Sequence, residues 1–266
     1  MQQAEDFRAE SRALAAILED LPEAAFHEAT QFKDWTIDHV LGHLHLFNAA
    51  AEASLQGEDE FAAFIAPVLQ DMQAGKTILE CQFPWLGGLS GRALFQAWRD
   101  GAERCADAYA AADPKRRLKW IGPDMSALSA ITARQMETWA HGQEVFDLLG
   151  LQRQDHDRIR NIAHLGVATY GWSFANRGLE VPEPAPFVQL TGPSGAVWEW
   201  NTPQAGNFVK GSAVEFAQVV TQVRNAGDTG LQAEGAAAQD WMRIAQCFAG
   251  PPETPPGKGS RFTAKT

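Results

Sequence analysis

The chain has 266 residues, of which 45% are hydrophobic, 10% aromatic and 21% charged, a composition typical of soluble globular proteins. It contains no apolar run of about eighteen residues, the length that a membrane-spanning helix needs, so the composition argues against membrane insertion. The net charge of -11 disfavours nucleic acid as a partner, because no stripe of lysine or arginine offsets it.

The beginning of the chain is acidic from Glu5 onward and lacks the basic start and apolar core of a secretory signal, so we expect a cytoplasmic protein. Cys81, Cys105 and Cys247 are scattered and form no CxxC motif, which favours packed small side chains over disulfides. The nine tryptophans are expected mostly as anchors of the core and of interfaces. Trp139 has the alternative role of a pocket wall.

Helical spacing of apolar residues predicts four long helices before residue 150. The first covers 4–20 and the third covers 92–113. The second begins at the cap candidates Asp34 and Thr36 and ends at Gly57, and the fourth runs from Ser126 to Gly150. A further helix is predicted over 58–74. The segment CQFPWLGGLSG breaks the helical pattern between them. Residues 1–150 are therefore predicted to form a helical bundle.

The pattern changes after residue 150. A connecting helix, predicted over 151–176, leads to an α+β domain over 177–250. Two β-prone runs, 187–191 and 196–200, flank a Gly-Pro-Ser-Gly turn and predict a hairpin. A strand in NFVKGS and helices in AVEFAQVVTQVRN and AAAQDWMRIAQCFAG complete the prediction, and the Pro/Gly-rich residues 251–266 are expected to be a flexible tail.

Two pairs of polar residues at helical spacing are the candidate site. His39 and His43 lie one turn apart on the second predicted helix, and Glu137 and His141 lie one turn apart on the fourth. If these faces meet, two or three imidazoles and one carboxylate form a set suited to Zn²⁺ with an open coordination position. The spacing alone leaves two alternatives, a solvated Glu137–His141 ion pair and a packed core imidazole at His43. Glu144 extends the acidic side of the same helix, as the edge of the site or as part of a solvated face.

The stretches DWTIDHVLGHL and METWAHGQEVFDLLG resemble two helices of the DinB-like metal-binding bundles, and more narrowly of the maleylpyruvate isomerase group that uses mycothiol. The resemblance implies metal ligands at His43, Glu137 and His141. Through AHLGV, VVTQVRN and WMRIAQCFAGPP, residues 160–250 resemble the C-terminal domain of an uncharacterised two-domain subfamily.

The same resemblance implies roles for two further residues. In the isomerase an arginine of the C-terminal domain faces the substrate carboxylates, and Arg224 is the nearest candidate in this sequence, with a surface ion pair as the alternative. His39 matches no ligand of the family and is a candidate fourth ligand or a support for the ligands.

The candidate metal ligands and the family resemblance together predict a function. We expect an enzyme that depends on a divalent metal, Zn²⁺ in the first place, and on a low-molecular-weight thiol such as mycothiol. It would act as an isomerase or S-transferase on a small electrophilic acid. The alternatives are a non-enzymatic module that binds a metal or small ligand, and a metal-dependent hydrolase. The sequence leaves both a monomer and a dimer open.

Overall fold

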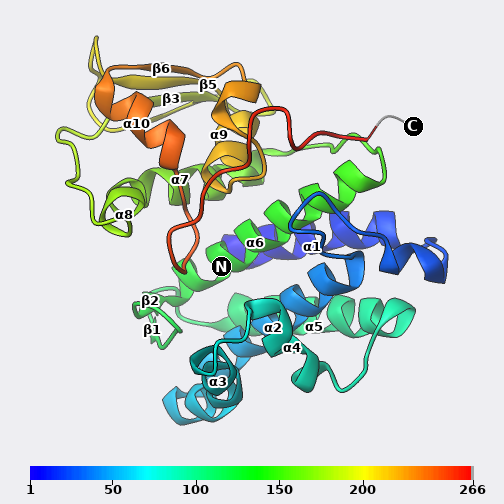
Figure 1. Ribbon diagram of the computed structural model, residues 1–266. Helices are drawn as coiled ribbons and strands as arrows, with labels where there is room; N and C mark the ends of the chain where they lie inside the picture. The colour runs from blue at the N-terminus through cyan, green and yellow to red at the C-terminus, as the bar shows by residue number, and fades with distance from the viewer. Residues whose placement is uncertain (265–266) are drawn as a thin grey trace. The chain divides into compact units, whose positions relative to one another are not determined.

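The computed structural model describes residues 1–264 and divides the chain into two compact units, Met1–Leu148 and Leu149–Thr266. The first unit consists mainly of helices, and the second combines helices with a four-stranded sheet (Figure 1). This confirms the predicted fold class, mainly α with a C-terminal α+β part. Among the described residues, no helix combines the length and the hydropathy that crossing a membrane requires.

Four long helices form the core of the first unit, as predicted: α1 (Gln2–Leu18), α2 (Ile37–Gln56), α5 (Gly91–Ala111) and α6 (Ala127–Leu148). Helix α2 packs against α5 and α6, and α1 packs against α5 and α6 (Figure 1). The apolar sides of these helices meet in a buried cluster that includes Phe7, Tyr109 and Ile131, all fully inaccessible to solvent. Burial of these faces holds α2 and α6 together.

Smaller elements complete the first unit. They are η1 (Glu23–His27), α3 (Glu58–Gln73), α4 (Ile78–Leu86) and the paired strands β1 (Arg117–Leu118) and β2 (Met125–Ser126). The helix α4 corrects the prediction of an irregular segment. Thr77 and Glu80 form a capping box at its start, and Gly87 ends it with a left-handed φ of 58°, so the helix spans Pro84.

The second unit contains a sheet with helices on one side (Figure 1). Its strands are β3 (Phe187–Thr191), β4 (Val197–Trp200), β5 (Phe208–Ser212) and β6 (Gln232–Glu234), in the order β4-β3-β5-β6. Strands β3 and β4 form the predicted antiparallel hairpin, whereas β5 runs parallel to β3. The three-residue strand β6, which pairs with β5, is too short for its pattern to be recognised in the sequence.

The helices of the second unit are shorter than predicted. They are η2 (Asp157–Ile159), α7 (Arg160–Ala168), α8 (Tyr170–Ala175), α9 (Ala213–Val220), η3 (Ala226–Asp228) and α10 (Ala236–Ile244). One continuous helix was expected up to residue 176, but the Thr169 hydroxyl bonds to the carbonyls of Leu165 and Gly166 where α7 ends. Gln222, with a left-handed φ of 59°, follows the early end of α9.

Residues 251–264 contain no helix or strand. Their backbone nevertheless accepts hydrogen bonds from side chains of the second unit. The carbonyl of Glu253 accepts from Arg177 and Gln222, and the carbonyl of Pro256 accepts from Asn225. This part of the chain is therefore attached to the second unit more closely than its Pro/Gly-rich composition predicts.

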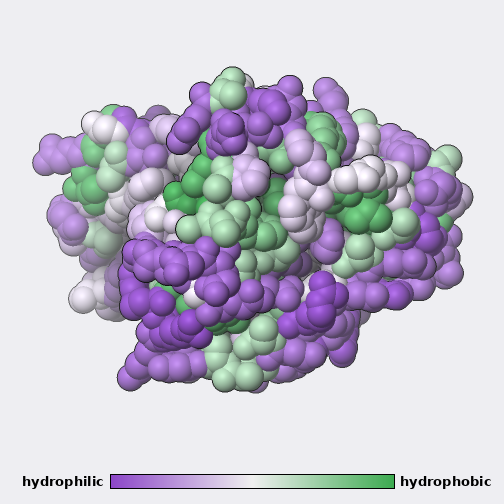
Figure 2. All heavy atoms as spheres, turned by 90° about the horizontal axis from the view of Figure 1, so that it is seen from below, coloured by the Kyte–Doolittle hydropathy of each residue, from purple (hydrophilic) through white to green (hydrophobic). Residues whose placement is uncertain are grey.

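Figure 2 shows one face of the molecule, on which hydrophilic residues cover much of the surface and hydrophobic residues lie between them in separate patches. In the first unit, a stretch around α4 exposes large hydrophobic side chains: Phe83, Trp85 and Leu89 are 46%, 37% and 41% exposed. Trp98 and Trp139 are instead fully buried. Trp139 is thus a core anchor of α6.

Candidate metal centre

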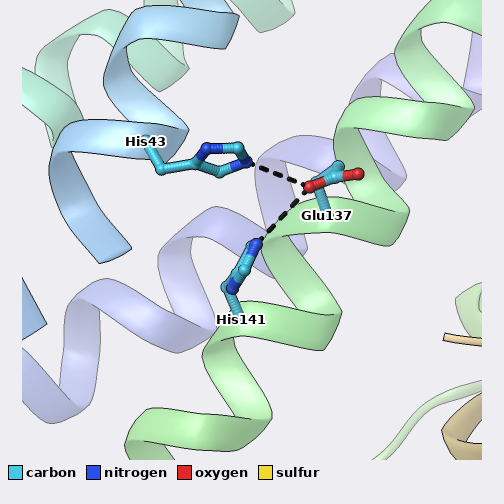
Figure 3. A group of neighbouring side chains, drawn as sticks. All are labelled: His43, Glu137 and His141. Carbon is cyan, nitrogen blue, oxygen red and sulfur yellow. Dashed lines mark hydrogen bonds and ion pairs between the residues drawn. The ribbon is translucent and has the colours of Figure 1, made fainter. Parts of the chain in front are cut away.

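Three side chains converge inside the first unit. His43 comes from α2, Glu137 and His141 come from α6, and the three point toward one another (Figure 3). One potential ligand atom of each lies within 4.8 Å of the other two. From Glu137 Oε2 the distance is 3.2 Å to His43 Nε2 and 3.5 Å to His141 Nε2. The packing of α2 against α6 therefore brings together residues 94 positions apart in the chain.

The beginning of α2 positions His43. The Thr36 hydroxyl accepts the backbone N–H of His39 at 3.2 Å, and His39 Nδ1 accepts the backbone N–H of Thr36 at 3.1 Å. This reciprocal cap fixes where the helix begins and hence which face carries His43. His39 therefore uses a ring nitrogen in the cap, and the three-residue cluster does not include it.

Aromatic rings enclose the two histidines. Lys33 and Asp34 have left-handed φ angles of 51° and 56°, and the turn that they form directs Trp35 toward the cluster. The indole of Trp35 lies nearly parallel to the His141 ring, at 5.8 Å between centroids and 6° between planes. It also lies 5.5 Å from the His43 ring. These contacts restrict how the imidazoles can turn, and a spacing rule limited to polar residues does not find them.

Glu144 holds His141 from the side opposite Glu137. Its Oε2 lies 2.9 Å from His141 Nδ1, and Glu144 is only 6% exposed. Because a carboxylate only accepts, His141 Nδ1 carries the proton of this bond, and Nε2 faces the cluster. The alternative of a solvated face for Glu144 is therefore wrong.

The three groups differ in charge. Burial lowers the pKa of His43 to about 4, against the smaller opposing effect of its hydrogen bond with Glu137. Burial also disfavours the charged form of His141, but Glu144 and Glu137 together raise its pKa to about 10. Burial opposes ionisation of Glu137 too, yet hydrogen bonds with His141 and His43 hold its pKa well below the ordinary value. At neutral pH the cluster thus contains one neutral imidazole, one imidazolium and one carboxylate.

The donor set fits a divalent metal ion. Nitrogen and oxygen ligands of Zn²⁺ lie about 2.0–2.2 Å from the ion, so two ligands of one tetrahedral site are about 3.4 Å apart. The separations of 3.2 and 3.5 Å between the carboxylate oxygen and the two imidazole nitrogens agree with that value. Two imidazoles and one carboxylate would leave a coordination position for water or substrate.

The cluster does not include the remaining histidine of α2, and the candidate arginine belongs to the other unit. The His45 ring contacts Trp85 at 4.9 Å between centroids, so it points away from the cluster as expected. Arg224 belongs to the second unit, just beyond α9, where its Nη1 donates to the carbonyl of Val223.

These features define a class: a helical bundle whose α2 and α6 carry a His-Glu-His candidate metal centre. The family model described as the mycothiol maleylpyruvate isomerase N-terminal domain matches residues 7–146, and the chain belongs to this family. The match covers α2 and all but the last two residues of α6, and thus all three residues of the cluster. The family resemblance predicted from the sequence is confirmed.

Comparisons with known proteins extend over both units. Two uncharacterized proteins of Mycobacterium tuberculosis, one from each of two strains, are 39% identical to this chain over 247 residues, or 93% of this chain and 95% of each relative. The crystal structure of the mycothiol-dependent maleylpyruvate isomerase is similar with a TM-score of 0.54 at 14% identity, covering 87% of this chain and 91% of that one. A mutant of the isomerase gives a TM-score of 0.51 at 15% identity, covering 82% and 87%. At these identities the structural likeness shows a shared fold.

Proposed function

We propose that this protein is an enzyme that depends on a divalent metal and a low-molecular-weight thiol, an isomerase or S-transferase acting on a small electrophilic acid. The observation that carries the proposal is the convergence of His43, Glu137 and His141 to within 4.8 Å in a domain of the mycothiol maleylpyruvate isomerase family. The solved relatives are named as mycothiol-dependent enzymes, which supports mycothiol as the first thiol to test.

In this proposal His43, Glu137 and His141 hold the ion, for which Zn²⁺ is the first choice because its ligands are typically imidazole and carboxylate. A bound divalent ion supplies Lewis acidity that lowers the pKa of a thiol or water at its open position. The enzyme would work in the cytoplasm, where such thiols are kept reduced.

The other residues of the site orient the ligands and limit water. Glu144 keeps His141 Nε2 directed at the cluster through the bond at Nδ1. Trp35, only 6% exposed, covers both imidazoles. The Glu137 side chain is 22% exposed, compared with 11% for His43 and 10% for His141, so Glu137 is the most accessible of the three. Orientation of an anionic substrate by Arg224 remains part of the proposal.

The test is a reaction of zinc-loaded protein with an electrophilic unsaturated acid in the presence of mycothiol, bacillithiol or glutathione. We expect isomerisation or thioether formation that requires both metal and thiol and that is abolished in Glu137→Ala. The variant His156→Asn, which changes an exposed histidine of the second unit, is the matched control and should retain the full rate.

Each other result assigns a different function. Metal binding with no rate above background for any of the three thiols would replace the proposal with a non-enzymatic binding module. Metal-dependent hydrolysis of an ester or amide without any thiol would replace it with a hydrolase that uses a metal-activated water.

A further inference from the structure

A buried arginine lies one turn before the ligands on α6. Arg134 is only 3% exposed, and its Nε donates to Asn48 Oδ1 of α2 at 3.1 Å. Its guanidinium lies 5.8 Å from the centroid of the Phe47 ring, and that ring lies 4.8 Å from the His43 ring. Arg134 precedes Glu137 by three positions, so the two share one face of α6. The guanidinium therefore adjoins the candidate metal centre.

This arginine has no carboxylate partner among the described residues. Its one hydrogen bond goes to the neutral amide of Asn48, and its Nη2 is buried without an acceptor. A buried charge is costly unless an opposite charge and further hydrogen bonds compensate it, so the pairing of an arginine with a single amide is unusual.

Two more buried polar atoms lack partners, one on the residue bonded to Arg134 and one a helical turn further along α6. They are Asn48 Nδ2 and Thr138 Oγ1, and both residues are fully buried. Because Arg134 Nε must donate, Asn48 Oδ1 is the acceptor, and Nδ2 is left as a donor. Thr138 follows Arg134 by four positions, on the same face of α6, and its hydroxyl can donate as well. Three potential donors and a positive charge thus lie beside the metal centre without a hydrogen-bond acceptor, and Glu137, the carboxylate of the centre, interacts with the guanidinium only through its charge.

We propose that Arg134, together with Asn48 and Thr138, binds a carboxylate group of the substrate beside His43 and Glu137. The inference rests on the proposed function, because it names the residues that recognise the small acid. A guanidinium and an amide present several N–H donors, and a carboxylate accepts through two oxygens, which makes it the acceptor with the best geometric match. A diacid held by one carboxylate at Arg134 would extend its other end toward the ligands.

The experiment measures binding of fumarate, and of its neutral diamide fumaramide, by calorimetry to the zinc-loaded and to the metal-free full-length protein. The variants are Arg134→Gln, which removes the charge, and Asn48→Asp. The second places a carboxylate next to Arg134, so it satisfies the guanidinium internally, keeps the fold and repels an anion. Zinc stoichiometry is recorded for every protein.

We expect each variant to bind fumarate roughly tenfold to hundredfold more weakly than the wild type, with zinc stoichiometry unchanged. Weak fumaramide binding should be the same in all three proteins. Equal fumarate affinity in the three proteins, no fumarate binding by the wild type, or a parallel loss for fumarate and fumaramide would overturn the inference. If the wild type catalyses the thiol reaction and all three proteins bind fumarate with equal affinity, only the role of Arg134 is contradicted. If the two variants bind fumarate more weakly than the wild type but the wild type catalyses no thiol reaction, only the proposed function is contradicted.

Discussion

The protein holds the two histidines of the candidate centre unequally. His141 is fixed by its bond with Glu144 at Nδ1 and by the nearly parallel indole of Trp35. His43 Nδ1 is buried without a hydrogen-bond partner, so that ring is oriented by aromatic contacts and by its one bond, from Nε2 to Glu137. The ligands with the strongest support therefore lie on α6, and His43 completes the set from α2.

Replacing Glu144 tests this support. In Glu144→Gln the amide can still accept from His141 Nδ1, but the negative charge that makes the imidazole a better ligand is lost. We expect zinc affinity to fall roughly tenfold to hundredfold with the fold preserved. The matched control is Asp147→Asn, which alters another buried carboxylate of α6, one that accepts from Gln143. Competition with a chelating dye measures both affinities, and an equal loss in the two variants would contradict a specific role of Glu144.

The protonation of His141 predicts how metal binding depends on pH. Since the pKa of His141 is raised to about 10, the metal-free protein carries a proton there at neutral pH, and a metal ion must displace it. Metal affinity should therefore rise by about tenfold per unit as the pH increases from about 6 to 8, with about one proton released per ion. Calorimetry in buffers of different ionisation enthalpy counts the protons. Affinity that stays constant over this range would show that His141 is neutral in the free protein.

At the scale of elements, helix caps and helical spacing in the sequence predicted where helices begin and which residues share a helix face. Of the two predicted cap candidates, Asp34 and Thr36, Thr36 is the N-cap of α2, and the spacing of Glu137 and His141 places both on one face of α6. The helix α4 was missed because Pro84 and the two following glycines were interpreted as breakers. The capping pair of Thr77 and Glu80 was the available signal, and it outweighs one proline in a nine-residue helix.

Contacts between distant segments explain the rest of what the sequence did not predict. The bond between Glu144 and His141 is local, but the burial that makes Glu144 a partner instead of a solvated acid comes from packing. The pairing of Arg134 with Asn48 spans 86 positions and depends on the register of α2 against α6. Helical periodicity indicates which residues share a face of one helix, but it does not indicate how the faces of two helices such as α2 and α6 align.

The close approach of α7 and α9 gives a test in the second unit. A Cβ at Gly166 would lie 2.8 Å from Val220 Cγ2 and 3.0 Å from Phe216 Cε1, in a fully packed contact. Gly166→Ala should therefore lower the free energy of unfolding by roughly 1–2 kcal/mol, after allowance for the better helix propensity of alanine. At Gly171 the same atom would meet nothing nearer than 3.9 Å, so Gly171→Ala is the control and should change stability by less than about 1 kcal/mol. Urea denaturation compares the two, and equal stabilities would contradict the packing argument.

At the scale of the whole molecule, the candidate centre lies entirely within the first unit, Met1–Leu148, and within the part that matches the family model. The second unit contains Arg224, whose role stays a proposal. The β3–β4 hairpin of this unit, and the presence of helices in it, were predicted from the sequence pattern. Relatives that are 39% identical cover nearly the full chain, so the two units occur together in those proteins as well.

The most direct test of the account is the zinc content and affinity of purified, metal-replete protein, measured by elemental analysis and titration. We predict one divalent ion per chain in the wild type and its loss in His43→Ala, Glu137→Ala and His141→Ala. His45→Ala, a histidine of α2 whose ring faces Trp85, should keep the ion. A wild type without bound ion, or metal binding that is unaltered in Glu137→Ala, would contradict the claim that these three side chains form a metal site.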